Sequence, residues 1–204
     1  MTTHQLGLLA VVSIAACWGA VALAWLAGAI YYDSRAPAER TRAWYASPLL
    51  MAALIAFATS AVVPRPDWRP LEVHAPLVRI LGLAILLAAT GLTLWARLAL
   101  GAMWSAAPTV KEEHKLRTSG PYAITRHPIY TGFLGMIVGS ALLAGAGPWI
   151  VYCLVYLVLV QFKIHVEERL MLAEFPDEYP RYRQRVPQLI PGLRLPARHK
   201  VASG

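Results

Sequence analysis

The chain has few charged residues. Only 15% of its 204 residues are Asp, Glu, Lys or Arg, against roughly 25% in an ordinary soluble domain. Hydrophobic residues make up 57% of the chain, and the mean hydropathy is +0.49. A water-soluble core could not bury that many apolar side chains. This composition excludes a disordered or fibrous chain and predicts an integral membrane protein.

Cysteine is also scarce. The two cysteines, Cys17 and Cys153, each lie inside an apolar stretch, so they cannot form a disulfide framework or a zinc site, and we expect no metal. A GxGxxG motif after a strand pattern is missing, which excludes a Rossmann-type enzyme. The net charge of +8 would suggest nucleic acid in a soluble protein. In a membrane protein it fits basic loops, and we expect no nucleic-acid partner.

Five apolar stretches predict five transmembrane helices, at residues 6–30, 47–63, 76–100, 128–144 and 148–162. The link at 145–147 is Gly-Ala-Gly, which predicts a tight hairpin between the last two. Gly135 and Gly139, on the fourth of these helices, favour close packing against a neighbouring helix. Arg79 and Arg97 lie about 27 Å apart along the third helix, and we expect each side chain to reach an opposite membrane interface.

The distribution of basic residues predicts the orientation. The first loop, the third loop and the tail carry fifteen Lys and Arg residues, and the second and fourth loops carry two. Basic residues collect on the cytoplasmic side. We therefore expect an inner-membrane protein of bacterial type, with its N-terminus outside and its C-terminus in the cytoplasm.

Two polar cytoplasmic stretches remain for any chemistry, at residues 101–127 and 163–204. In the first, Gly120 belongs to a Ser-Gly-Pro turn, where a ligand can approach the backbone closely. Arg126, His127 and Tyr130 follow around Pro128, which suits the first turn of a helix. The simpler alternative is that Arg126 and Tyr130 only anchor the helix at the membrane interface.

In the second stretch, the apolar pattern predicts that the fifth helix continues through Glu167 and Glu168 to about Phe175, ending before Pro176. These carboxylates would lie about one turn beyond the membrane edge, where ionisable groups are costly unless they are paired or functional. For this segment a plain intrahelical ion pair is the alternative to a functional site.

Two motifs resemble a known family. The runs RTSGPYAITRHPIYTG (117–132) and EERLMLAEFPDEYPRYRQRVPQLIP (167–191) are similar to the isoprenylcysteine carboxyl methyltransferase family, whose wider superfamily includes membrane phospholipid N-methyltransferases. The pair of motifs on neighbouring cytoplasmic segments is specific, whereas either one alone is weak. Ala107 departs from the pattern, since eukaryotic prenylcysteine enzymes carry a Gln at that position.

The resemblance implies an all-α, polytopic membrane enzyme of one domain, 1–204. Residues 1–100 would supply three spans, and 101–204 would supply the catalytic part with two spans. S-adenosylmethionine would lie in a cytoplasmic pocket closed by the C-terminal segment. By position, the implied cofactor-binding residues are His114, Lys115, Leu116, Arg117, Gly120, Tyr122, Arg126, His127, Pro128, Ile129, Tyr130, Glu167 and Glu168.

The implied catalytic residues are Arg185, which matches the family arginine near the methyl acceptor, and Glu168. We expect carboxyl O-methylation of a lipophilic, isoprenoid-like small molecule, with membrane lipids around it and no protein partner. A carboxylate is already ionised at pH 7 and needs only a cation to orient it. Two other acceptors stay open, a phospholipid amine and a small thiol, which would need Glu168 or His127 as a base. A non-catalytic scaffold or carrier is the alternative of another class.

Overall fold

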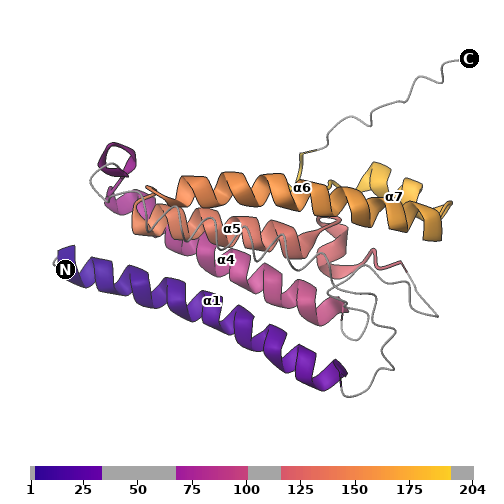
Figure 1. The fold of residues 1–204 in the computed structure, drawn as a ribbon, viewed down its shortest axis with the longest axis horizontal. Helices are drawn as coiled ribbons and strands as arrows, with labels where there is room; N and C mark the ends of the chain where they lie inside the picture. Colours follow the sequence, from indigo (N-terminus) through magenta and orange to yellow (C-terminus); the bar gives the residue numbers. More distant parts are fainter. Residues whose placement is uncertain (1–2, 34–67, 101–115, 194–204) are drawn as a thin grey trace, which may run out of the picture.

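A computed structural model describes residues 3–33, 68–100 and 116–193 (Figure 1). Within these ranges the chain is helical and contains no β-strand, only an isolated bridge between Glu72 and Ala146. Three helices in the described part of the chain are long and apolar enough to cross a membrane. The predicted all-α class is confirmed for the described residues, whereas the stretch at 47–63 lies outside them.

The long helices match the predicted spans closely. Helix α1 covers Thr3–Asp33, α4 covers Pro76–Leu100 and α5 covers Pro128–Ala144. Both α4 and α5 begin at a proline, whose missing N–H and fixed φ suit the first helical position. In Figure 1 these helices run side by side with α6 (Trp149–Glu174), and α4 and α5 lie between α1 and α6.

Helices α5 and α6 form the predicted tight hairpin. Gly145, Ala146 and Gly147 all have positive φ, at 103°, 63° and 57°, and glycine takes this conformation without the steric cost that a Cβ brings. Helix α6 then covers Trp149–Glu174. It stops before Pro176 because proline cannot continue a helix, as the sequence predicts.

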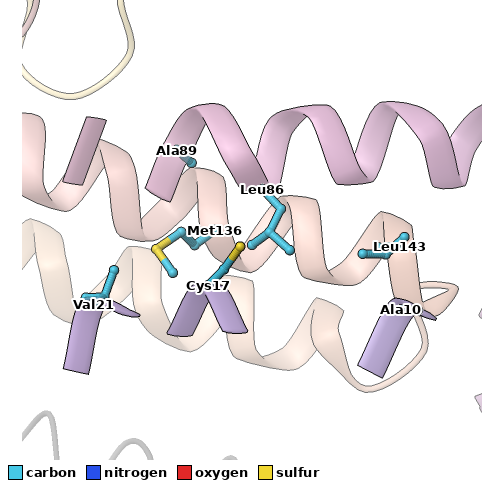
Figure 2. Close-up of a cluster of buried hydrophobic side chains, with 7 residues drawn as sticks. All are labelled: Ala10, Cys17, Val21, Leu86, Ala89, Met136 and Leu143. Atoms are coloured by element: carbon cyan, nitrogen blue, oxygen red, sulfur yellow. The ribbon is translucent and has the colours of Figure 1, made fainter. Parts of the chain in front are cut away.

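Glycines bring α4 and α5 into close contact. A Cβ built on Gly139 would lie 2.6 Å from the backbone nitrogen of Leu86, and one on Gly135 would lie 2.7 Å from the Cβ of Ala89. The predicted close packing at these two glycines is therefore confirmed. Beside this contact, the buried core joins α1, α4 and α5 (Figure 2), and its members are Ala10, Cys17, Val21, Leu86, Ala89, Met136 and Leu143.

Arg97, in the last turn of α4, is buried against a neighbouring helix. Its side chain is only 4% exposed, and it packs against α1. The guanidinium lies 5.8 Å from the ring centroid of Trp25, and a methyl group on Gly28 would overlap it. The absence of a side chain at Gly28 thus leaves room on α1 that the sequence of α4 alone could not reveal.

Short elements complete the end of the bundle at which α4 and α6 finish and α5 begins. The 3-10 helix η3 covers Gly120–Ala123, just before α5. After α6, helix α7 covers Glu178–Arg185 and lies beside the end of α6 (Figure 1). At the opposite end, the 3-10 helix η1, Arg69–Leu71, precedes α4. Of the two polar stretches that the sequence predicts on one side of the membrane, the described parts, 116–127 and 163–193, lie together at the end of the bundle where α5 begins.

Candidate active site

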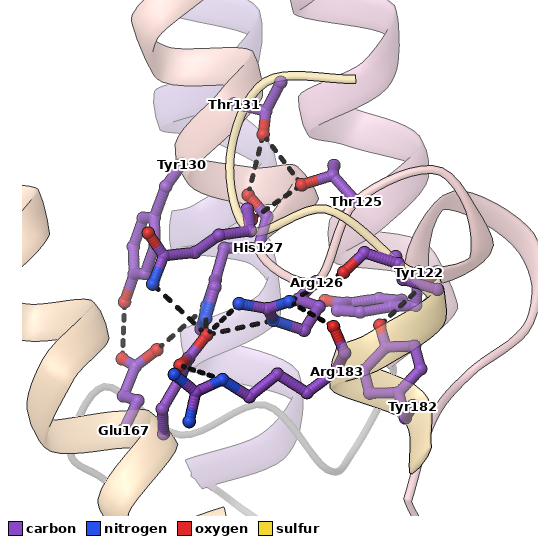
Figure 3. Close-up of polar contacts among 12 residues, drawn as sticks. Tyr122, Thr125, Arg126, His127, Tyr130, Thr131, Glu167, Tyr182 and Arg183 are labelled. Atoms are coloured by element: carbon purple, nitrogen blue, oxygen red, sulfur yellow. Dashed lines mark hydrogen bonds and ion pairs between the residues drawn. The ribbon is translucent and has the colours of Figure 1, made fainter. Parts of the chain in front are cut away.

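Polar side chains from three elements meet where α5 begins (Figure 3). Arg126 and His127 precede α5, and Tyr130 lies in its first turn. Glu167 and Glu168 come from the last turns of α6, and Arg183 comes from α7. The two motifs that carry the family resemblance are therefore brought into direct contact.

Glu168 is buried among several donors. Its side chain is 7% exposed, and its Oε1 accepts a hydrogen bond from Nε of Arg126 at 3.0 Å and lies 2.8 Å from Nη2 of the same guanidinium as an ion pair. Gln188 donates to the same oxygen at 3.3 Å, while Nε of Arg183 lies 3.6 Å from Oε2. These donors hold the carboxylate within the folded protein, and its burial leaves little of it accessible to a ligand.

Glu167 differs from its neighbour. Its side chain is 26% exposed and accepts one hydrogen bond, from the hydroxyl of Tyr130. Nδ1 of His127 lies 3.6 Å from its Oε2. A carboxylate has about four acceptor positions, so Glu167 retains acceptor capacity on an accessible side chain.

His127 lies between the two carboxylates. Its side chain is 10% exposed, and its ring stacks on that of Tyr130, with centroids 5.7 Å apart and planes at 17°. Nε2 is 3.4 Å from Oε1 of Glu168 and lacks a hydrogen bond of good geometry. Burial lowers the pKa of His127, but Glu167 and Glu168 outweigh burial, so the pKa is raised above its usual value. The imidazole therefore favours its protonated, cationic form.

The chain after α7 runs along the start of α5. The carbonyl of Pro187 accepts a hydrogen bond from the backbone N–H of Arg126 at 2.9 Å, and that of Gln188 accepts one from the N–H of His127 at 3.2 Å. The hydroxyl of Thr125 also donates to the Gln188 carbonyl, at 2.8 Å. The hydroxyl of Thr131 donates to the carbonyl of Leu189. We call residues 186–189 the C-terminal strap.

Two tyrosines connect η3 to α7. The hydroxyl of Tyr182 donates to the carbonyl of Tyr122 at 2.6 Å, and both side chains are buried. Burial raises the pKa of Tyr182 to about 12, so it stays a neutral donor. Burial raises the pKa of Tyr122 as well. This contact fixes the turn around Gly120 against α7.

The remaining predicted residues are placed less centrally. Pro128 is buried, Leu116 and Ile129 are half-buried, and Arg117 and Gly120 are exposed. Arg185 is exposed on α7, and its Nε donates to the carbonyl of Arg181 at 3.3 Å; no contact between Arg185 and the carboxylates is found among the described residues. His114 and Lys115 lie outside the described residues.

Sequence reasoning missed several members of the cluster. Arg183 and Gln188 reach Glu168, and the ammonium of Lys163 lies 5.5 Å from the ring centroid of Tyr130. Lys163 carried a usable signal, since it precedes Glu167 by four positions and so shares its helix face. Arg183 carried none, because a helix turns by about 100° per residue and the pattern does not say which arginine of α7 faces α6.

Comparisons with known proteins agree with this architecture. The family model described as Phospholipid methyltransferase matches residues 77–178, half of the chain. Protein-S-isoprenylcysteine O-methyltransferase from Schizosaccharomyces pombe is 39% identical over 83 residues, which is 39% of this chain and 34% of that protein. Methanethiol S-methyltransferase 2 from Bradyrhizobium diazoefficiens is 37% identical over 78 residues, 38% of this chain and 29% of that one. The matched stretches thus span about a third of each of these two relatives.

A solved structure shares the fold. The eukaryotic intramembrane Ras methyltransferase ICMT (isoprenylcysteine carboxyl methyltransferase) aligns with a TM-score of 0.56 and 20% sequence identity. The alignment covers 88% of this chain and 68% of that one. At this identity the likeness concerns the fold alone, which is that of an all-helical membrane protein.

Proposed function

Because the chain belongs to the phospholipid methyltransferase family, we propose that it is an S-adenosylmethionine-dependent methyltransferase whose active site is the cluster at the start of α5. The observation that carries the proposal is the difference between its two glutamates. Glu168 is enclosed by protein donors, whereas Glu167 is accessible and has acceptor capacity left. An accessible carboxylate with unused acceptor positions suits a ligand that carries a cationic donor.

The residues present fit this cofactor. S-adenosylmethionine carries a sulfonium and an ammonium, and Glu167 can accept a hydrogen bond from the ammonium or lie beside the sulfonium. The buried Nε2 of His127, which lacks a well-formed hydrogen bond, gives a further polar group that a ligand could satisfy. Tyr122, Gly120 and Arg117 lie on the η3 side and would complete the pocket. When bound, the cofactor supplies an electrophilic methyl group, and the protein's task is alignment.

For the acceptor we propose a lipophilic carboxylate. The raised pKa of His127 favours its protonated form, which carries no free lone pair with which to deprotonate an amine or a thiol. Glu168 is equally unsuited, since it is held by Arg126 and Gln188. A carboxylate needs no deprotonation, only orientation by a cation and exclusion of water. The likeness to the isoprenylcysteine O-methyltransferase of fission yeast supports the same acceptor class.

Arg185 is our proposed cation for that carboxylate. Its planar fork can hold a carboxylate through two parallel hydrogen bonds. It lies at the end of α7, two residues beyond Arg183, whose guanidinium approaches Glu168. Its Nε donates to the carbonyl of Arg181, and a ligand carboxylate would take the place of that acceptor.

A thiol is the second candidate acceptor, because one relative is named as a methanethiol S-methyltransferase. A phospholipid amine is the third candidate acceptor. A non-catalytic scaffold or carrier would need neither the accessible carboxylate nor the cationic histidine.

In the membrane, we propose five spans, with the second at residues 47–63, and the N-terminus outside. The catalytic half, residues 101–204, would then face the cytoplasm, closed by α7 and the C-terminal strap. The substrate's apolar chain would enter laterally from the bilayer among the first three spans.

Calorimetry with S-adenosylmethionine on the purified protein in detergent tests the cofactor. We expect saturable one-site binding. Isotopically labelled cofactor, presented with prenylated carboxylates, phospholipid amines and small thiols in turn, then identifies the acceptor, and we expect transfer to the carboxylates. Absence of cofactor binding by a folded sample would contradict the proposed function, whereas transfer only to thiols or amines would replace the acceptor.

A further inference from the structure

The guanidinium of Arg126 is directed at protein acceptors on all three nitrogens. Its Nε donates to Oε1 of Glu168, and Nη2 lies 2.8 Å from the same oxygen as an ion pair. Its Nη1 donates to the carbonyls of Arg183 at 3.0 Å and Val186 at 2.7 Å. A guanidinium has five N–H donors in a fixed fork. Three of them donate hydrogen bonds and Nη2 is paired with the carboxylate, so no two nitrogens are left to hold a ligand carboxylate.

The acceptors of Arg126 lie on separate elements. Glu168 belongs to α6, whereas the carbonyls of Arg183 and Val186 lie at the C-terminal end of α7. The carbonyls that end a helix carry partial negative charge and have no partner within the helix, so a buried cation satisfies them. The side chain of Arg126 is only 8% exposed, which strengthens these interactions.

The main chain adds to the same junction. The backbone N–H groups of Arg126 and His127 donate to Pro187 and Gln188 of the C-terminal strap. Arg126 thus contacts the strap with its backbone and, through the carbonyl of Val186, with its side chain, which also reaches the carbonyl of Arg183 on α7. Displacing its guanidinium would loosen α7, the strap and the Glu168 carboxylate together.

We propose that Arg126 is a positioning residue that fixes α7, the C-terminal strap and Glu168 against the start of α5, and that it does not contact the cofactor. This assignment replaces the cofactor-binding role that the resemblance implies for Arg126. The proposal depends on the proposed function in one respect, namely that the ligand of the site held in place is S-adenosylmethionine.

Trypsin susceptibility tests the structural part of the proposal without any ligand. Arg185 is exposed beside the strap, so its peptide bond becomes cleavable when α7 and the strap detach. Lysine keeps the charge of Arg126 but cannot span Glu168 and two carbonyls with one nitrogen. We expect Arg126→Lys to speed cleavage after Arg185 by about tenfold, and the matched change at an exposed position of α6, Arg169→Lys, to leave it unchanged. Equal cleavage rates in all three proteins would overturn the proposal.

A second variant guards against misfolding of Arg126→Lys. Thr131→Val removes the hydroxyl that donates to the carbonyl of Leu189 and keeps nearly the same shape. We expect a smaller but measurable acceleration of the same cleavage. Unchanged cleavage in Thr131→Val would contradict the view that contacts with the start of α5 hold the strap.

Two ligands separate positioning from direct contact. S-adenosylhomocysteine carries an amino acid carboxylate, whereas 5′-methylthioadenosine lacks it. If Arg126 only positions the site, Arg126→Lys should weaken the binding of both ligands by the same factor, within about twofold. A loss confined to S-adenosylhomocysteine would assign Arg126 to the ligand carboxylate and overturn the proposal. If the wild type bound neither nucleoside, the proposed function would fail, and the cleavage rates alone would decide the role of Arg126.

Discussion

Removing the Glu168 carboxylate should destabilise the protein strongly. The side chains of Arg126 and Glu168 are 8% and 7% exposed and are joined at 2.8 and 3.0 Å. In Glu168→Leu the guanidinium of Arg126 stays buried without its anion. Removing one partner of a buried ion pair typically lowers the free energy of unfolding by about 3–5 kcal/mol. Glu168→Gln keeps one acceptor oxygen and loses only the charge, so we expect a smaller cost of about 1–3 kcal/mol.

Thermal unfolding in detergent measures this difference. For a chain of about 200 residues, 1 kcal/mol shifts Tm by about 2–4 °C, so Glu168→Leu should melt about 6–20 °C below the wild type. Glu174→Leu is the matched control, because Glu174 is exposed at the end of α6, and it should melt within about 2 °C of the wild type. A Tm of Glu168→Leu equal to that of the control would refute the view that the Arg126–Glu168 pair holds the cluster together.

Three further predictions address packing, pH and the acceptor. Gly139→Ala should lower the free energy of unfolding by about 1–3 kcal/mol because the new methyl meets α4 backbone, whereas Gly91→Ala, in open space on α4, should be neutral or slightly stabilising; equal melting of the two would contradict the close packing. Because the pKa of His127 is raised on folding, its contribution to stability is complete below about pH 6.5 and is lost as pH rises through the folded pKa. Tm should therefore fall above neutral pH in the wild type and fall less in His127→Gln, and parallel curves would contradict the cationic imidazole. Arg185→Lys should keep cofactor affinity and cut turnover on a carboxylate substrate by about tenfold. Loss of cofactor binding with normal turnover would contradict the assignment of Arg185 to the methyl acceptor.

Helix positions were predictable because local signals set them. The apolar runs at 76–100 and 128–144 coincide with α4 and α5, since a proline opens each run and the apolar length defines the rest. The end of α6 near Phe175 followed from Pro176 in the same way. Positive φ at Gly145 and Gly147 likewise fits the hairpin that their spacing indicated.

The division of roles within the site was not predictable from the sequence. Glu167 and Glu168 are adjacent, so they point about 100° apart on the helix, and their burial depends on where Arg126 and the strap pack against α6. The inward position of Arg97 likewise depends on Gly28, which lies on a different helix. Both features arise from tertiary contacts between segments far apart in the chain, and no local pattern encodes them.

The affinity of Glu167→Gln for S-adenosylmethionine tests the central claim most directly, because Glu167 is the accessible carboxylate that the proposed site offers to a cationic ligand. Calorimetry in detergent should show Kd raised by about tenfold to a hundredfold, as expected for loss of a charged hydrogen bond of about 1.5–3 kcal/mol, with Tm nearly unchanged. Glu174→Gln, at an exposed position of the same helix, should bind like the wild type. Wild-type affinity in Glu167→Gln, at an unchanged Tm, would contradict the assignment of this cluster as the cofactor site.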